Sequence, residues 1–214
     1  MGIEQPLLEA LFRYSPRPTL EEAIRCFKVL EIQNIAADVA TAQRDLAIEF
    51  NTRRREIDNL PPLNHRDFLV GVVGVGIKPI PEHDDRYGWF AYAAWNTKPH
   101  PNQEKFCAER RVGRRALRRG CTCMVGLAVV GVLNTGGDGR SGKDGPGPTL
   151  DPCEVCRDDM RGEFNSLYRA YTPVLTEHPQ TKARAMRPVS DFMRHHGETW
   201  WEAHSNVKLL RRGG

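Results

Sequence analysis

Three cysteines and one glutamate have the residue types and the spacing of a catalytic zinc site. Two residues separate Cys153 from Cys156 in the run DPCEVCRDD, and Cys107 lies earlier in the run QEKFCAERR. Two thiolates at C-x2-C spacing can bind one tetrahedral zinc ion, and a third sulfur brings the number of protein ligands to three. Three protein ligands leave the fourth zinc position open, which is typical of catalytic rather than structural zinc.

Glu109 follows Cys107 by two residues, so its carboxylate can point into such a site without binding the metal. From there it could carry protons between a water molecule and a substrate. Each motif alone has a plainer interpretation. C-x2-C also suits a redox dithiol, Cys107 could be a small buried side chain, and Glu109 could be an ordinary acid at a helix start. Both motifs together, at two expected helix starts, favour zinc.

These residues resemble those of a known family, the small zinc-dependent cytidine deaminases of the three-cysteine type, to which blasticidin-S deaminase is related. The family's C-A-E motif occurs here at 107–109, and its P-C-x-x-C-R motif occurs at 152–157. The resemblance implies Zn²⁺ as cofactor, Glu109 as the catalytic proton carrier and hydrolytic release of ammonia from a cytosine ring. It implies three metal ligands, which are Cys107, Cys153 and Cys156.

The resemblance extends to positions that would bind the substrate or support the metal. Phe68 matches a pocket-lining phenylalanine, and Asn96 matches the asparagine of the family's N-x-E ribose-binding motif. Ala108 would contact the base through its backbone N–H. Arg110 and Arg157 follow the two zinc motifs, and their positive charge would moderate the three thiolates.

Lys98 departs from the family, because it replaces the glutamate of the N-x-E motif. Lysine only donates hydrogen bonds, so it cannot accept one from a ribose hydroxyl. Two interpretations stay open: Lys98 selects a substrate with a phosphate, a carboxylate or an altered sugar, or it points to solvent. Two further departures are Asp158, where the family commonly has glutamine, and a longer loop before Pro152.

Composition sets the class of protein. The chain has 214 residues, with 40% hydrophobic and 27% charged residues, which predicts a globular protein with one sizeable domain. The net charge of +4 permits an anionic ligand without requiring nucleic acid. The apolar runs at 68–77 and 124–133 are about half the length that spans a bilayer, so we expect buried strands. No signal peptide is evident, and we expect a cytoplasmic protein without disulfides.

The order of predicted elements indicates an α/β protein. Helical spacing and a capping box at Thr19 and Glu22 predict two N-terminal helices with a break near residue 32. The predicted strands are 68–77, 89–96, 124–133 and 172–178, and the later helices are 106–119, 153–167 and 187–196. With the resemblance, we expect a three-layer α/β/α cytidine deaminase-like sandwich around one mixed sheet. The expected division is an N-terminal helical extension at 1–60, a zinc domain at 61–198 and a tail at 199–214.

The helix that follows Cys107 carries two rows of arginines, Arg110, Arg114 and Arg118 in one and Arg111, Arg115 and Arg119 in the other. They could bind phosphate. The favoured interpretation is a solvated face or an oligomer interface, with the arginines paired to acids such as Asp158, Asp159 and Glu163. Cys121 and Cys123 alternate across a strand and cannot easily share a metal, so we expect them to pack in the core with Cys26.

Three functions follow from these observations. The first is deamination of a free cytosine nucleoside, nucleotide or modified nucleoside by a homo-oligomer, a dimer or tetramer, with no membrane partner. The second is deamination of single-stranded DNA or RNA, which the mild net charge makes less favoured. The third is a catalytically silent zinc-binding interaction protein, which would not need Glu109.

Overall fold

The computed structural model describes residues 2–63, 69–97, 107–131, 154–177 and 182–194. Three helices come first, α1 (Gln5–Tyr14), α2 (Leu20–Phe27) and α3 (Leu30–Ile57). Two strands and a helix follow, β1 (Val70–Ile80), β2 (His83–Trp95) and α4 (Ala108–Arg118). The remaining elements are β3 (Cys123–Gly131), α5 (Glu154–Arg161), β4 (Pro173–Glu177), β5 (Arg184–Pro188) and α6 (Val189–Arg194).

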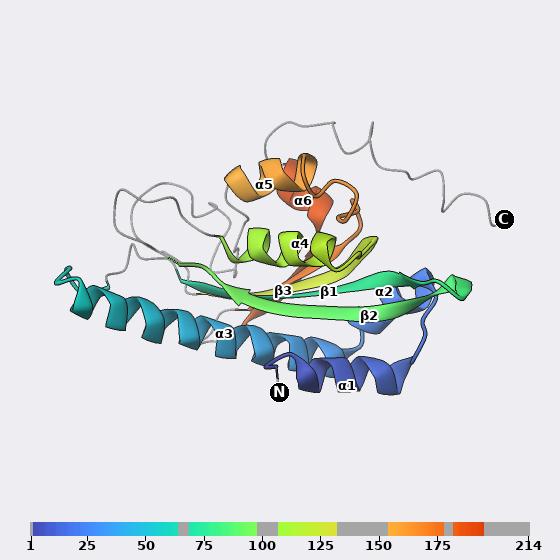
Figure 1. The fold of residues 1–214 in the computed structure, drawn as a ribbon, viewed down its shortest axis with the longest axis horizontal. Coiled ribbons are helices and arrows are strands. Elements are labelled where there is room, and N and C mark those ends of the chain that lie inside the picture. The colour runs from blue at the N-terminus through green and yellow to red at the C-terminus, as the bar shows by residue number, and fades with distance from the viewer. Residues whose placement is uncertain (1, 64–68, 98–106, 132–153, 178–181, 195–214) are drawn as a thin grey trace.

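The strands form one mixed sheet in the order β2-β1-β3-β4-β5. β1 is antiparallel to both β2 and β3, β3 is parallel to β4, and β4 is antiparallel to β5. Helices α1, α2 and α3 cover one face of this sheet, and α4, α5 and α6 cover the other (Figure 1). The predicted three-layer α/β/α sandwich around a mixed sheet is therefore confirmed.

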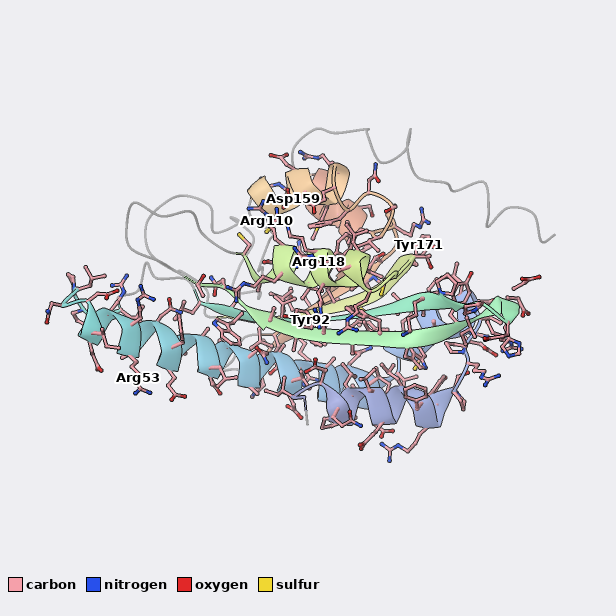
Figure 2. The ribbon with its side chains drawn as sticks, viewed as in Figure 1. Arg53, Tyr92, Arg110, Arg118, Asp159 and Tyr171 are labelled. Atoms are coloured by element: carbon pink, nitrogen blue, oxygen red, sulfur yellow. The ribbon has the colours of Figure 1, made fainter. Side chains whose placement is uncertain are left out.

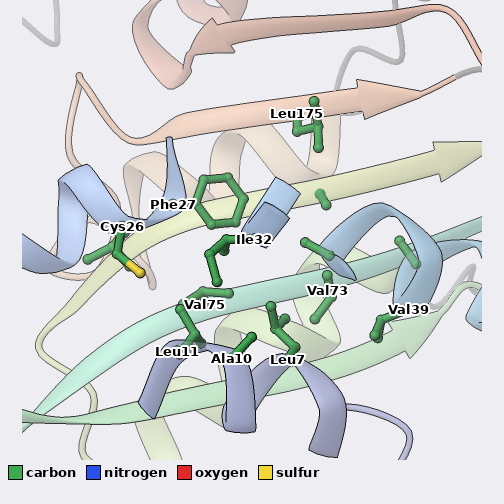
Figure 3. Packing of buried hydrophobic residues seen from close by; sticks show 14 of the residues in the cluster. Leu7, Ala10, Leu11, Cys26, Phe27, Ile32, Val39, Val73, Val75 and Leu175 are labelled. Atoms are coloured by element: carbon green, nitrogen blue, oxygen red, sulfur yellow. The ribbon is translucent and has the colours of Figure 1, made fainter. Parts of the chain in front are cut away.

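Alternation along β1 divides the core into two layers. Val73, Val75 and Ile77 face α1–α3, where they pack against buried side chains of all three helices (Figure 3). Val70 and Val72 face the other way and pack with α4 and the segment after α5. The run of valines is apolar on both sides because both faces of the sheet are covered.

Two glycines of β1 let helices approach the sheet closely. A Cβ atom at Gly71 would lie 1.9 Å from the carbonyl oxygen of Ala40 in α3. On the opposite face, a Cβ atom at Gly74 would lie 2.3 Å from Cγ1 of Val112 in α4. Real Cβ atoms do not come so near to other atoms. The absence of a side chain at Gly71 therefore lets α3 lie close to the sheet, and its absence at Gly74 does the same for α4.

The N-terminal segment differs from the prediction in the number of its helices. The predicted capping box is present, with the Thr19 hydroxyl accepting from the Glu22 N–H and the Glu22 carboxylate accepting from the Thr19 N–H. The chain forms three helices rather than two, and α2 ends at Phe27, earlier than the break predicted near residue 32. Pro16 and Pro18 separate α1 from α2, because proline disfavours helix in the residue before it.

Other differences concern strands. β5 was not predicted, and it takes the first residues of the helix predicted at 187–196. The segment 78–88, predicted as a connection, extends β1 and β2 into a hairpin whose turn follows Ile80. The helix predicted at 153–167 ends at Arg161, next to Gly162, and turns fill the rest. Among the described helices, none is both long and apolar enough to cross a membrane.

Candidate functional site

The topology brings the starts of two helices to one edge of the sheet. Because β2 and β3 are both antiparallel to β1, they run in the same direction on either side of it. α4 follows β2 along the chain, and α5 follows β3. Both helices therefore begin beyond the carboxyl ends of two strands that run in the same direction and flank β1, a place where open α/β sheets bind ligands.

Cys107 and Glu109 lie at the start of α4. Cys107 is the N-cap residue, with extended backbone angles (φ −68°, ψ 141°), and its side chain makes no capping hydrogen bond. Glu109 lies in the first turn, where the helix dipole favours a negative charge. Both side chains are partly exposed, whereas Ala108 between them is fully buried. At the start of α4, the sulfur of Cys107 and the carboxylate of Glu109 are therefore accessible, and Ala108 packs into the core.

Cys156 of α5 meets this helix start directly. Its side chain is buried, with only 1% of the residue exposed. Its Sγ donates a hydrogen bond to Oε2 of Glu109 at 3.7 Å. This contact joins the two predicted zinc motifs, which are far apart in the sequence, and it places the predicted proton carrier against a predicted metal ligand.

The described part of the predicted donor set fits zinc. Cys107 and Cys156 supply two sulfurs, and Glu109 lies beside them as a carboxylate outside the ligand set. Cys153, the third predicted ligand, lies outside the described residues, and the described residues alone contain no group of three side chains that could hold a metal ion. Thiolates are preferred zinc ligands, so the donor chemistry matches the metal implied by the sequence.

The first arginine row of α4 holds the two helices together. Arg110 forms an ion pair with Asp159 of α5, and the two side chains lie between the facing helices (Figure 2). Arg114 pairs with Glu163 at 3.5 Å. The prediction that these arginines pair with nearby acids is confirmed for both. Asp158, also proposed as a partner, pairs with Arg161 of its own helix instead.

The second arginine row stacks on aromatic rings of β2. The guanidinium of Arg111 lies 5.9 Å from the ring centre of Trp95, and Nη1 of Arg111 donates to the Trp95 carbonyl oxygen at 3.2 Å. The guanidinium of Arg115 lies 5.5 Å from the ring centre of Tyr92. Both arrangements are cation–π contacts, and they bind α4 to the edge strand of the sheet.

Asn96, a predicted substrate-binding residue, closes the end of the β1–β2 ladder. Its Oδ1 accepts a hydrogen bond from the Val70 N–H at 2.8 Å, and its own N–H donates to the Val70 carbonyl oxygen at 3.2 Å. Phe68 and Lys98 lie outside the described residues. Substrate contacts by Asn96 and Ala108, and charge moderation by Arg110 and Arg157, stay predictions.

Tyr168 belongs to this region, although sequence reasoning missed it. The side chain is fully buried and packs at the α4 and α5 side of the sheet. Burial raises the pKa of Tyr168, and negative charge at Glu109 and Cys156 raises it further. Tyr168 lies after α5, outside any helix, strand or turn, and so gives no periodic signal; only the three-dimensional structure shows that it approaches the site.

The other cysteines lie in the core, as predicted. Cys26 and Cys123 are buried in the layer between the sheet and α1–α3, whereas Cys121 is buried in the opposite layer. Burial raises the pKa of Cys26 to about 12, and burial is also the main cause that raises the pKa of Cys121 to about 12. These thiols remain protonated at neutral pH, which suits packing residues rather than nucleophiles or ligands.

Known proteins that are similar to this chain are found among solved structures. No family model matches the chain, and no curated protein matches it. Among solved structures, the chain is similar to a cytidine deaminase from Burkholderia pseudomallei, with 21% sequence identity and a TM-score of 0.41. The similar region covers 69% of this chain and 94% of that one.

Proposed function

We propose that the protein is a zinc-dependent hydrolytic deaminase that acts on the cytosine ring of a free nucleoside, nucleotide or modified nucleoside. The observation that carries the proposal is the contact between Cys156 of α5 and Glu109 of α4. A packing cysteine has no need of a carboxylate partner, and a structural zinc site has no need of a glutamate beside its ligands.

The proposed reaction exchanges the ring amine for the oxygen of a water molecule and releases ammonia. Cys107, Cys153 and Cys156 would hold the metal. Bound zinc would supply a Lewis acid that makes water a stronger nucleophile at neutral pH. Glu109 would take a proton from the attacking water, deliver it to the ring nitrogen and carry a second proton to the departing amine. The backbone N–H of Ala108 would orient the base.

The proposal is tested by an ammonia-release screen of the purified, zinc-loaded protein. The substrates are cytosine, cytidine, deoxycytidine, CMP, aminoacylated cytosine nucleosides and single-stranded DNA. We expect ammonia and the matching uracil product from at least one free nucleoside or nucleotide, and none from that substrate with the Glu109→Ala variant. Bound zinc with no ammonia from any substrate would instead favour a silent zinc-binding interaction protein.

One observation favours a second candidate, deamination of a single-stranded polynucleotide. Tyr92 and Trp95 on the edge strand β2 alternate with Arg111 and Arg115 of α4, and all four side chains are partly exposed. Rings beside guanidinium groups are the elements on which unpaired bases stack. Turnover of single-stranded DNA that falls steeply with salt, and that Arg115→Ala weakens more than turnover of CMP, would favour this candidate.

The expected homo-oligomer also remains a proposal. A dimer or tetramer would follow from the family resemblance, in which a neighbouring subunit can close the substrate pocket. Light scattering of the purified protein measures the mass directly. A monomer at the concentrations used for the ammonia assay would exclude a shared pocket.

A further inference from the structure

Tyr168 carries a buried hydroxyl that the described residues leave without a hydrogen-bond partner. The side chain has no exposed surface, so bulk water does not reach the oxygen. Buried tyrosine hydroxyls normally find an acceptor, because an unsatisfied one loses its hydrogen bonds to water without replacement. An unsatisfied hydroxyl of this kind is a candidate donor to a polar group close by.

The surroundings of Tyr168 identify the acceptor. Its ring packs edge-on against Phe164, with ring centres 6.4 Å apart. It shares its hydrophobic cluster with Ala108, the residue before Glu109, and with Met160, one helical turn after Cys156. Among the described residues, negative charge at Glu109 and at Cys156 also raises the pKa of Tyr168, and Glu109 has the larger effect of the two. A carboxylate is a stronger acceptor than a sulfur atom, so Glu109 is the preferred partner.

We propose that Tyr168 is a positioning residue whose hydroxyl donates a hydrogen bond to the carboxylate of Glu109. Cys156 already donates to Oε2 of Glu109, and a carboxylate has room for further donors. A second donor from the buried side would fix the carboxylate in the direction needed for proton transfer. The catalytic consequence rests on the proposed deaminase function, but the hydrogen bond itself does not.

The kinetic test compares Tyr168→Phe with Tyr171→Phe. The first substitution removes only the proposed donor. The second removes a hydroxyl from a half-buried ring whose electrostatic neighbours include Cys123, a residue of the opposite core layer, and Arg169. We expect Tyr168→Phe to lower kcat by roughly tenfold to a hundredfold, the range for a misplaced catalytic group, with little change in KM and in bound zinc. Tyr171→Phe should leave kcat within a factor of about two.

A melting-temperature cycle separates positioning from a general structural role. The four proteins are the wild type, Tyr168→Phe, Glu109→Ala and the double variant. If the hydroxyl binds Glu109, Tyr168→Phe lowers Tm in the wild type. The same substitution leaves Tm unchanged or raises it in the Glu109→Ala background, where the hydroxyl has lost its acceptor. A side chain that only fills space would lower Tm equally in both backgrounds.

A spectroscopic measurement keeps the inference testable if Tyr168→Phe does not fold. A tyrosine hydroxyl that is buried and bound to a carboxylate gives a slowly exchanging proton resonance in the wild type, and Glu109→Ala should abolish it. Equal Tm changes in both backgrounds, or no such resonance, would overturn the inference. If the wild type binds no zinc and releases no ammonia, the proposed function fails instead, and the Tm cycle and the resonance still decide on Tyr168.

Discussion

Cysteine occurs on both faces of the sheet, and its surroundings differ from one face to the other. On the face covered by α1–α3, Cys26 and Cys123 lie among aliphatic side chains, and burial raises the pKa of both thiols. On the face covered by α4 and α5, the equally buried Cys156 has the carboxylate of Glu109 as its hydrogen-bond partner. Cys123 also donates to the carbonyl oxygen of Met124 at 3.5 Å. The carboxylate partner, rather than burial or a hydrogen bond as such, therefore distinguishes the candidate ligand Cys156 from these packing cysteines.

The two helical layers also differ in how they attach to the sheet. α3 approaches through small residues, among them Ala36, Ala37 and Ala40, which are fully buried. α4 approaches through Val112 and Ala116, but it is also tied to β2 and α5 by arginines. Aliphatic packing stabilises the fold but is not directional, so it constrains the position of a helix only weakly. Ion pairs and cation–π contacts depend on geometry, and they fix the starts of α4 and α5 relative to each other. The first layer supports the fold, and the second positions the candidate site.

The largest difference that we expect between the two faces is in zinc content after a cysteine is removed. Cys156→Ala removes a predicted zinc ligand, so metal analysis of the purified variant should show a sharp drop from about one equivalent per chain, with turnover lost as well. Cys26→Ala, on the opposite face, should keep the full equivalent. Full zinc retention in Cys156→Ala would show that the ligand assignment is wrong.

The next largest effect is on stability, and we expect it on the face covered by α1–α3. Phe27 is fully buried between α2 and the sheet, close to Gly126, so Phe27→Ala should lower the free energy of unfolding by about 3–5 kcal/mol in a urea titration. The folded fraction should still bind its zinc. Phe12→Ala removes a ring of the same kind that is 47% exposed, and it should change stability by about 0.5 kcal/mol or less. Equal costs at the two positions would contradict the proposed core.

A third effect concerns catalysis alone. Glu109→Ala should keep the fold and the metal but reduce ammonia release by about a hundredfold or more, the usual cost of removing a general acid–base group. Glu49→Ala is the matched control, because Glu49 is an exposed acid of α3 on the other face. Near-wild-type turnover in Glu109→Ala would mean that another group transfers the protons.

Much of this comparison was predictable from the sequence. The apolar runs that contain β1 and β3 have the length and composition of buried strands, and the segments after Cys107 and Cys153 have the composition of helices. Once two such helices follow parallel strands, the meeting of Cys156 with Glu109 follows from topology. The pairing of Arg110 and Arg114 with acids of α5 and of the turn after it was predictable from charge alone.

What could not be predicted depends on long-range contacts. β5, with the sequence RAMRP, has few strand-forming residues and exists because it pairs with β4. The hairpin extension through His83 is mostly exposed and polar, so its periodicity is weak. Tyr168 lies outside any helix or strand, and its approach to Glu109 depends on how α5 packs on α4. Short-range patterns carry no information about such contacts.

The smallest effect we expect compares two polar contacts, one in each helical layer. Thr19→Ala removes the capping box of α2, in which the Thr19 hydroxyl accepts from the Glu22 N–H at 3.2 Å, and it should cost about 1 kcal/mol. Arg114→Ala removes the half-exposed pair with Glu163 and should cost about 0.5 kcal/mol or less, because solvent screens it. Urea titrations at neutral pH measure both changes.

The same capping box has a pH dependence whose sign follows from Glu22. The hydrogen bond from the Thr19 backbone N–H is the main cause that lowers the pKa of Glu22, and Arg86 lowers it further. A carboxyl with a lowered folded-state pKa stabilises the protein above its unfolded pKa, and that contribution is lost as the pH falls through the folded value. The wild type should therefore lose more stability in acid than Glu22→Gln does. Parallel losses in the two proteins would mean that the carboxylate of Glu22 does not stabilise α2.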